Sequence, residues 1–253
     1  MYTGEIKRRV LLYRIHLLFG KLFFSNTMAT ISLYGGIRHK SEYKVYNSTF
    51  QSLHSRHRLT TLLINSGGGY VDGAEYLIDS LHRIYHHVAA VNVGQCCSAA
   101  MSVYLACSRR FATKNSFFIV HHARSPLGYK IKRSKRVGRK ILYLVRQYDK
   151  DFFYRICPST TVEIEGKLNL NKEQWARVAE LLKRYDHTFY SHIKGDINAV
   201  ISHLKKRDNI VERTLINMTR ISKEMLEEKI GKGEDWLISA QEALKLGICH
   251  KIV

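Results

Sequence analysis

Three features of this sequence have residue types that could carry chemistry: a serine in a tight turn, a run of glycines and a histidine that ends an apolar segment. Ser98 lies in the small-residue sequence GQCCSAA, and His121 follows the apolar residues FFIV. A serine hydroxyl becomes a nucleophile when a nearby imidazole takes its proton. Backbone N–H groups in the glycine run 67–69, together with the N–H of Ala99, could stabilise the oxyanion that such an attack creates. Singly these features indicate a helix N-cap, a polar strand end and a turn, so their order along the chain carries more information than any one of them.

Strands and helices that alternate along the chain would position these residues. Short apolar or β-branched runs predict strands at 29–37, 59–64, 88–93 and 116–120. Apolar residues three and four apart predict a helix after the glycine run, and a helix rich in alanine follows Ser98. The alternation predicts an α/β layered fold in which each chemical feature follows a strand.

The second half of the chain, from about residue 130 to residue 245, has mostly helical patterns. The clearest helix begins at Asn171, with Gln174 at the position of a capping box. Its apolar stripe runs from Trp175 to Phe189 in steps of three and four, which is typical of packing in a core or an interface. Gly247 is predicted to end a last short helix before a C-terminal strand, 248–253.

The amino-acid composition limits the cellular compartments and the binding partners that we expect. The formal net charge is +20, yet no zinc-finger, RNP or helix-turn-helix signature accompanies it, so nucleic acid is not expected as the main partner. The five cysteines are odd in number and show no ligand spacing, which favours a reducing compartment and predicts no metal site. We therefore expect a cytoplasmic protein, or one in an organelle matrix or stroma.

The first 27 residues form a basic extension to the predicted domain. Residues 7–24 contain no acid, and Arg14, His16 and Lys21 interrupt their apolar runs, so the segment is too broken to span a membrane. A targeting or membrane-surface helix, a helix docked on the body, and a true start at Met28 are all open interpretations.

Four ordered segments of the sequence resemble the Clp protease proteolytic subunit family of serine peptidases. LLINSGGGYVDGAEYLIDSL resembles the family's INSPGG strand, turn and helix, and VGQCCSAAMSVYLA resembles its nucleophile turn. NSFFIVHHA resembles the segment that carries the catalytic histidine, and WLISAQEALKLGICHKIV resembles the C-terminal segment. The matching segments cover about a third of the chain, mainly 59–122 and 234–253.

The resemblance implies a fold, a site and an assembly. It implies an α/β, crotonase-like spiral of ββα units over residues 28–253, in which 130–230 form an enlarged helical handle. It implies a serine endopeptidase with Ser98 as nucleophile, His121 as base and the N–H groups of Gly68 and Ala99 as oxyanion hole. It also implies peptide or unfolded-protein substrates, a ring-shaped homo-oligomer, a possible ATPase unfoldase and no cofactor.

The chain departs from the family's pattern at several positions. Gly67 replaces the proline before the glycines, and Gly231 stands where the third triad residue aligns without a gap. Asp235 is the carboxylate chosen for that role, with Glu234 as fallback, and the role is to hold the imidazole in one tautomer. His122 is the alternative base, although the spacing from Asn115-Ser116 favours His121.

Two other functions are compatible with these departures. A non-catalytic Clp-like ring subunit would explain the missing acid. A crotonase-type acyl-CoA enzyme would use paired N–H groups on a thioester, usually without a serine and histidine pair. Labelling of Ser98 by a fluorophosphonate would distinguish the peptidase from both.

Overall fold

The computed structural model describes residues 23–24, 28–43, 59–84, 88–126, 134–157, 168–231 and 233–253. Most of the predicted extension 1–27 therefore lies outside the described residues, as do 130–133 and 158–167 of the predicted handle region. The chain separates into two compact units. The first comprises Met1–Val120, Arg213–Lys229 and Asp235–Val253, and the second comprises His121–Glu212 and Ile230–Glu234. In the described part of the chain, no helix is both long enough and apolar enough to cross a membrane.

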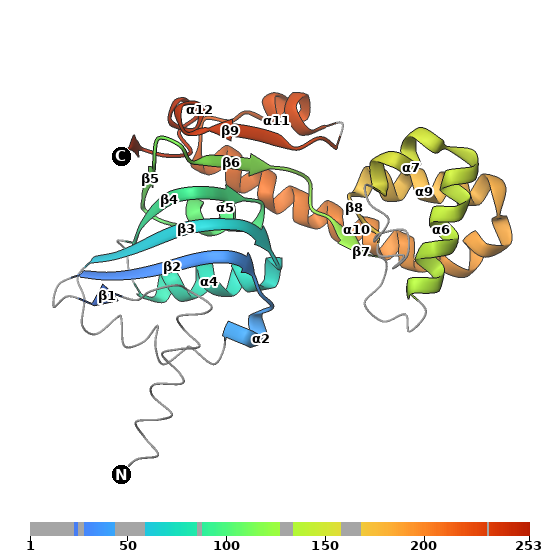
Figure 1. Ribbon diagram of the computed structural model, residues 1–253, viewed down its shortest axis with the longest axis horizontal. Coiled ribbons are helices and arrows are strands. Elements are labelled where there is room, and N and C mark those ends of the chain that lie inside the picture. Colours follow the sequence, from blue (N-terminus) through green and yellow to red (C-terminus); the bar gives the residue numbers. More distant parts are fainter. Residues whose placement is uncertain are drawn as a thin grey trace, which may run out of the picture. The chain divides into compact units, whose positions relative to one another are not determined.

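The first unit is built on a mixed sheet of eight described strands, flanked by helices (Figure 1). Its strands are β1 (Phe23–Phe24), β2 (Met28–Ile37), β3 (Leu59–Gly69), β4 (Val88–Cys97), β5 (Arg109–Ala112), β6 (Phe117–Val120), β9 (Trp236–Ser239) and β10 (Lys251–Ile252). Its helices are α2 (Lys40–Tyr43), α4 (Val71–Ile84), α5 (Ala99–Leu105), α11 (Lys223–Ile230) and α12 (Ala240–Lys245). The predicted α/β class is confirmed.

The central strands run parallel, which brings their carboxyl ends to one edge of the sheet. β3 pairs with β2 on one side and β4 on the other, while β1 and β9 pair antiparallel with β2 and β6. Ser66 on β3 pairs with Cys96 on β4, so the glycine run and the turn at Ser98 lie at neighbouring strand ends. This register positions the site.

β4 changes partner part way along its length. Ala89 to Asn92 pair with β5, whereas Gln95 to Cys97 pair with β6. The buried Asn92 supports the change, because its amide nitrogen donates to the carbonyl of Phe117 at 2.9 Å. The strand that precedes the histidines thus lies directly beside the strand that precedes Ser98.

Two strands continue beyond the ends predicted from sequence. β3 extends through the glycine run to Gly69 and β4 extends to Cys97, with a register shift between Ile64 and Ser66. The Asn65 side chain fills the space that Gly94 leaves, since a Cβ there would lie 2.6 Å from its oxygen. That oxygen accepts a hydrogen bond from the Gln95 N–H at 3.2 Å. These tertiary contacts continue the pairing through residues that look like turns.

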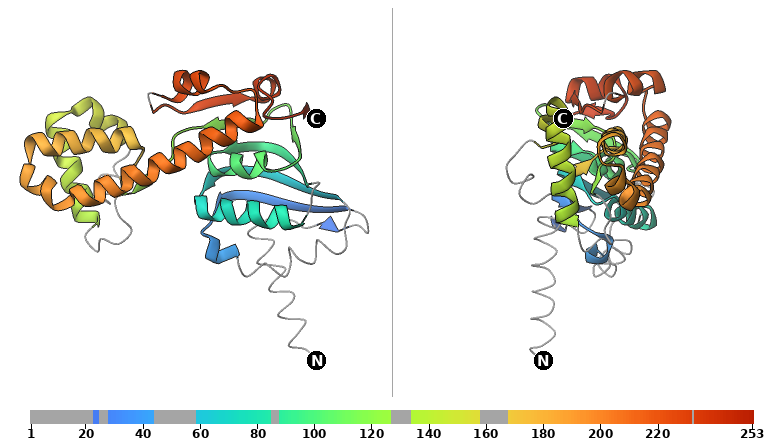
Figure 2. Two further views of the ribbon diagram at one scale, coloured as in Figure 1. Left: turned by 180° about the vertical axis from the view of Figure 1, so that it is seen from behind. Right: turned by 90° about the vertical axis from the view of Figure 1, so that its right-hand side faces the viewer.

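Helices α4 and α5 pack against each other and against strands of the sheet (Figure 2). α4 buries Ala74, Leu77 and Leu81, which follow the predicted helical spacing. α5 is buried along almost all of its length, which small residues permit because they let a helix approach a sheet closely. The core of this unit therefore lies directly beneath the turn at Ser98.

The second unit is mainly helical. It contains α6 (Ser134–Tyr148), α7 (Lys150–Ile156), α9 (Lys172–Tyr185), most of α10 (His187–Met218), and the short strands β7 (Ser125–Pro126) and β8 (Asn169–Leu170). Trp175 is fully buried in an apolar core shared by the four helices, and its indole N–H donates to the Ser125 carbonyl at 2.9 Å.

The predicted start of α9 is confirmed, but the predicted apolar stripe is interrupted. Asn171 and Gln174 form a reciprocal capping box. The helix ends at Tyr185, and Asp186 caps the next helix by accepting from the Phe189 N–H at 2.9 Å. Phe189 therefore belongs to α10, and the stripe is divided between two helices because Asp186 offers a local side-chain cap.

Candidate active site

Ser98 forms the turn between β4 and α5 in an unusual backbone conformation. Its φ of 53° and ψ of −126° make it the one residue other than glycine with positive φ among those described. A hydrogen bond of 3.0 Å from the Ser98 N–H to the Ile119 carbonyl ties the turn to β6. Although Ser98 occupies the N-cap position of α5, its side chain makes no capping hydrogen bond. The side chain of Ser98 therefore does not cap α5, as an ordinary N-cap serine would.

Gly68 lies directly against the Ser98 turn. A Cβ at Gly68 would lie 2.6 Å from the Cys97 oxygen, 2.8 Å from the Ser98 Cβ and 3.1 Å from the Ala99 nitrogen. Its φ of +89° is also one that side chains rarely adopt. The structure therefore brings Gly68, Ser98 and Ala99 together, and a glycine is needed for that approach.

The backbone of the glycine run is braced by Ser66. The buried Ser66 hydroxyl donates to the Gly35 carbonyl at 2.6 Å and accepts from the Gly68 N–H at 3.2 Å. The second of these contacts is at the long end of the usual range. Sequence reasoning did not single out Ser66, although it belongs to the resembling NSGG segment.

Asp235 and Glu234 are both exposed. Asp235 precedes Trp236, which pairs with Val120, the last residue of β6. Burial raises the pKa of the Cys97 thiol, the Ile119 backbone lowers it, and the Asp235 charge raises it further. The carboxylate of Asp235 is thus close enough to influence the residue next to Ser98.

His121 and His122 begin the second unit. The Nδ1 atom of His121 lies 2.6 Å from the carbonyl oxygen of His122. A carbonyl only accepts, so this contact requires the proton on Nδ1 and leaves Nε2 with a free lone pair. Within the described part of this unit, no carboxylate contacts His121.

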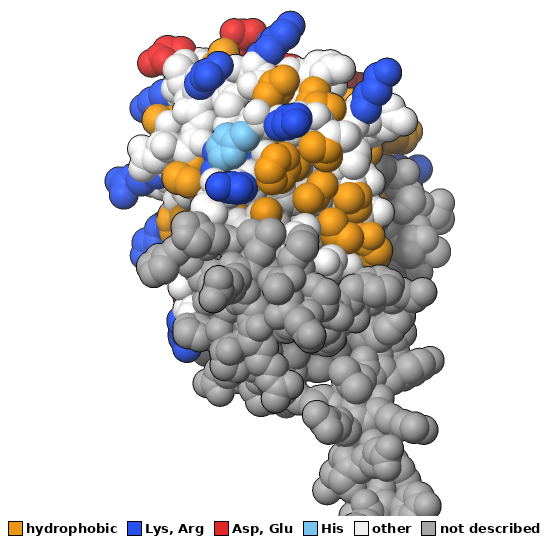
Figure 3. All heavy atoms as spheres, turned by 90° about the vertical axis from the view of Figure 1, so that its left-hand side faces the viewer, with side chains coloured by type: hydrophobic (Ala, Val, Ile, Leu, Met, Phe, Trp, Pro, Cys, Tyr) orange, Lys and Arg blue, Asp and Glu red, His pale blue; other side chains and the backbone are white. Residues whose placement is uncertain are grey.

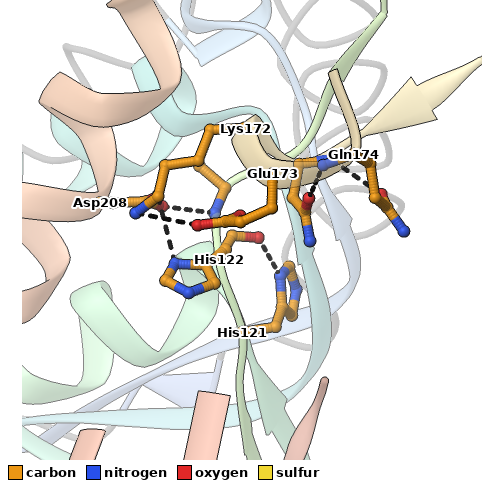
Figure 4. A network of polar contacts seen from close by, with 8 residues as sticks. His121, His122, Lys172, Glu173, Gln174 and Asp208 are labelled. Atoms are coloured by element: carbon orange, nitrogen blue, oxygen red, sulfur yellow. Dashed lines mark hydrogen bonds and ion pairs between the residues drawn. The ribbon is translucent and has the colours of Figure 1, made fainter. Parts of the chain in front are cut away.

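His122 takes part in a different, buried network, shown in Figure 4. Its Nδ1 lies 3.2 Å from Oδ2 of Asp208, and the Lys172 ammonium lies 2.9 Å from the same oxygen. Oδ1 of Asp208 accepts from the Ala123 N–H at 2.8 Å. Burial opposes ionisation of Asp208, but the contacts with His122 and Lys172 and the hydrogen bond from Ala123 more than offset it and lower its pKa.

Sequence reasoning missed Asp208. It lies within the segment LKKRDNIVER, where Asp208 and Glu212 among basic residues have the pattern of a solvated helix face. Its side chain is nevertheless only 7% exposed. No signal in the sequence indicates a buried carboxylate there, since its partners lie in other elements.

Among the described residues, no group of three or more His, Cys, Asp or Glu side chains could hold a metal ion.

No curated protein sequence matches the chain. A solved structure, a ClpP1 mutant from Listeria monocytogenes, aligns with a TM-score of 0.48 and 18% identity, over 98% of this chain and 95% of that one. The family profile described as Clp protease matches residues 23–180, which is more than half of the sequence. The chain therefore belongs to the Clp protease family.

Proposed function

We propose that the chain is a serine endopeptidase in which Ser98 attacks the peptide carbonyl and His121 is the base. The observation that carries the proposal is the junction of Gly68, Ser98 and Ala99, where a strained serine lies against the backbone of the glycine run. Positive φ at a nucleophile between a strand and a helix is the geometry of a nucleophile elbow. The family match supports the same chemistry.

The proposed reaction gives one role to each of these residues. Ser98 Oγ bonds to the carbonyl carbon while its proton moves to Nε2 of His121, the nitrogen left free by the contact of Nδ1 with the His122 carbonyl. The N–H groups of Gly68 and Ala99 stabilise the resulting oxyanion, with the Gly68 N–H exchanging its long contact to Ser66 for a stronger one. The C–N bond then breaks, Nε2 returns the proton to the leaving amine, and water hydrolyses the acyl-enzyme.

Asp235 stays the acid predicted from the sequence for this reaction. Asp235 is exposed, and Gly231 stands where the family's acid aligns without a gap, so the contribution of Asp235 is measured directly. Asp235→Asn is the variant that does so.

A non-catalytic subunit of the same family is the second candidate function. The observation that favours it is that, in the described part of the second unit, His121 contacts a backbone carbonyl instead of a carboxylate. Such a subunit would bind peptide or build a mixed ring without labelling at Ser98.

We also propose that the chain works as a ring-shaped homo-oligomer on peptides or unfolded proteins, with an ATPase unfoldase as a possible partner. Family membership supports the assembly. Exposed apolar side chains support it too: Tyr143, Tyr154 and Leu237 are 66%, 67% and 62% exposed. One face of the surface also carries grouped apolar side chains among Lys and Arg (Figure 3). Tyrosine is enriched where proteins associate.

The experiment that tests the proposed activity combines a covalent label with turnover. A fluorophosphonate probe should modify the parent protein once, at Ser98, as located by peptide mass spectrometry. Ser98→Ala should remove the label and lower kcat on a fluorogenic peptide by several orders of magnitude, with an unchanged melting temperature. A folded Ser98→Ala protein with parental activity would end the proposal. Hydrolysis without a label at Ser98 would place the nucleophile elsewhere, and neither label nor hydrolysis would favour the non-catalytic subunit.

A further inference from the structure

A single peptide group in the second unit connects His121 to a buried carboxylate. The carbonyl oxygen of His122 accepts from Nδ1 of His121 at 2.6 Å, and the N–H of the next residue, Ala123, donates to Oδ1 of Asp208 at 2.8 Å. These two groups belong to one planar peptide unit. The imidazole, the peptide and the carboxylate thus form one continuous chain of hydrogen bonds.

We propose that Asp208 orients His121 through the His122–Ala123 peptide group, which is the role predicted from the sequence for Asp235. The inference rests on the proposed peptidase function. In a direct triad the carboxylate accepts the Nδ1 proton itself, which sets the tautomer and stabilises the imidazolium. Here the peptide carbonyl accepts that proton, and the carboxylate holds the same peptide from its N–H side.

The electrostatics of the peptide group favour such a relay. A negative charge on the N–H side polarises the amide and makes its carbonyl oxygen a stronger acceptor, because hydrogen bonds in a chain reinforce one another. Asp208 can exert this effect because it is buried and is kept charged by His122 and Lys172. When Nε2 gains the serine proton, the polarised carbonyl stabilises the positive ring.

The position of Asp208 in α10 makes the connection rigid. The N–H of Ala123 and the ammonium of Lys172 both contact its carboxylate, so the segment after His121 is held against α10 and the start of α9 (Figure 4). A base must be held closely in place for efficient proton transfer. Asp208 is therefore a positioning residue, since it acts through the backbone and does not touch the reacting atoms.

The same network contains a competing base. His122 contacts Asp208 directly, and its Nε2 is buried without a hydrogen-bond partner in the described structure. If His122 were the base, Asp208 would act on it as an ordinary triad acid and the peptide relay would have no role. The test must separate these two histidines.

The second unit offers a matched control in Asp149. Like Asp208, Asp149 accepts from one backbone N–H, that of Phe152, and from one cationic side chain, that of Arg177. It caps α7 and has no contact with the histidines in the described network. Asp149→Ala should therefore reproduce the structural cost of losing such a carboxylate without affecting the base.

The experiment compares Asp208→Ala, Asp208→Asn and Asp149→Ala in the full-length protein. In metal sites, groups that hydrogen-bond to a ligand and orient it typically contribute about 10- to 100-fold, and we expect the same range here. We expect Asp208→Ala to lower kcat, and the rate of fluorophosphonate labelling at Ser98, by about that factor, with KM changed less than about twofold. Asp208→Asn, which keeps an oxygen for the Ala123 N–H, should recover part of the loss. Asp149→Ala should lower the melting temperature while kcat stays within about twofold of the parent.

A second readout does not depend on activity. The ¹⁵N shifts of the His121 ring report its tautomer, which should be Nδ1–H in the parent protein and in Asp149→Ala, and mixed in Asp208→Ala. If Asp208→Ala does not fold, Asp208→Asn decides by the same two readouts, with a smaller fall in kcat and a partial change of tautomer.

The outcomes separate the inference from the function on which it rests. Parental kcat and an unchanged tautomer in folded Asp208→Ala would overturn the relay while leaving the peptidase intact. A loss of kcat that merely follows melting temperature in both Asp208→Ala and Asp149→Ala would overturn it too. Greater loss in His122→Gln than in His121→Gln would make His122 the base. The tautomer change without any peptidase activity would overturn the proposed function and with it the catalytic role of Asp208.

Discussion

At the scale of single residues, the site depends on two backbone conformations that most side chains avoid. Ser98 has φ 53° and Gly68 has φ +89°, and the two residues lie in contact. A strained residue costs about 1–3 kcal/mol and persists only where its surroundings require it. The hydrogen bond from the Ser98 N–H to the Ile119 carbonyl is one such requirement. The serine is therefore presented by β3, β4 and β6 together.

Gly68→Ala and Gly67→Ala form a matched pair that tests this packing. The added Cβ at Gly68 would lie 2.6 Å from the Cys97 oxygen, whereas a Cβ at Gly67 meets nothing within 4 Å. We expect Gly68→Ala to lower the free energy of unfolding by about 1–3 kcal/mol, measured by urea denaturation, and to lower kcat sharply. Gly67→Ala should stay within about 0.5 kcal/mol of the parent, as most unconstrained surface changes do. Equal effects at the two positions would contradict the close approach.

At the scale of elements, Arg110 on β5 ties the C-terminal segment to the rest of the first unit. Its side chain is buried and donates to backbone carbonyls that end several elements. These belong to Ile248 at 2.8 Å, Met218 at 3.1 Å, Gly247 at 3.3 Å, Cys107 at 3.4 Å and Leu105 at 3.5 Å. The backbone N–H of Arg110 also donates to Nδ1 of His250 at 3.2 Å, and this hydrogen bond requires that Nδ1 carries no proton.

This last contact predicts a pH dependence in the C-terminal segment. Burial and the charge of Arg110 lower the pKa of His250 in the folded protein. The unfolded segment therefore takes up a proton at higher pH than the folded one, so its local stability is full above about pH 6.5 and falls as the pH drops below that value. Hydrogen exchange of the Val253 amide, which donates to Ala112, should become less protected at low pH.

His250→Asn is the control for that measurement. Asparagine does not titrate, and its side-chain oxygen can still accept from the backbone N–H of Arg110. The protection of the Val253 amide should therefore no longer depend on pH near pH 6. If the variant keeps the parental pH dependence, another group is responsible.

At the scale of the whole molecule, a formal net charge of +20 opposes the proposed ring. Each added subunit brings the same positive charge, and the repulsion between subunits is screened by salt. The screening length falls from about 30 Å at 0.01 M to about 8 Å at 0.15 M ionic strength. Assembly should therefore strengthen with salt over this range.

Multi-angle light scattering at micromolar concentration measures this effect. We expect a homo-oligomer near physiological ionic strength and a larger share of smaller species at low salt. A monomer at both ionic strengths would contradict the proposed ring, and a loss of oligomer on adding salt would indicate that ion pairs hold the subunits together.

The sequence by itself determined the features that depend on local chemistry. The strand, the turn at Ser98 and the small-residue helix follow from residue type and spacing, as does the capping box of Asn171 and Gln174. The helix pattern of α4 follows from its apolar spacing. These signals are readable because the interacting groups lie within a few residues of one another.

Only the tertiary structure decided which distant groups meet. Asp208 contacts Ala123 across 85 positions of sequence, and Gln95 bonds to Asn65 across 30. Neither contact leaves a mark in the local pattern, because an aspartate in a basic helix has the same spacing whether it is solvated or buried. Likewise, the glycine run indicates a backbone that can adopt unusual conformations, but only the parallel register of β3 and β4 places Gly68 against Ser98. The residue types thus indicate which groups can react, whereas long-range packing determines which partners orient those groups.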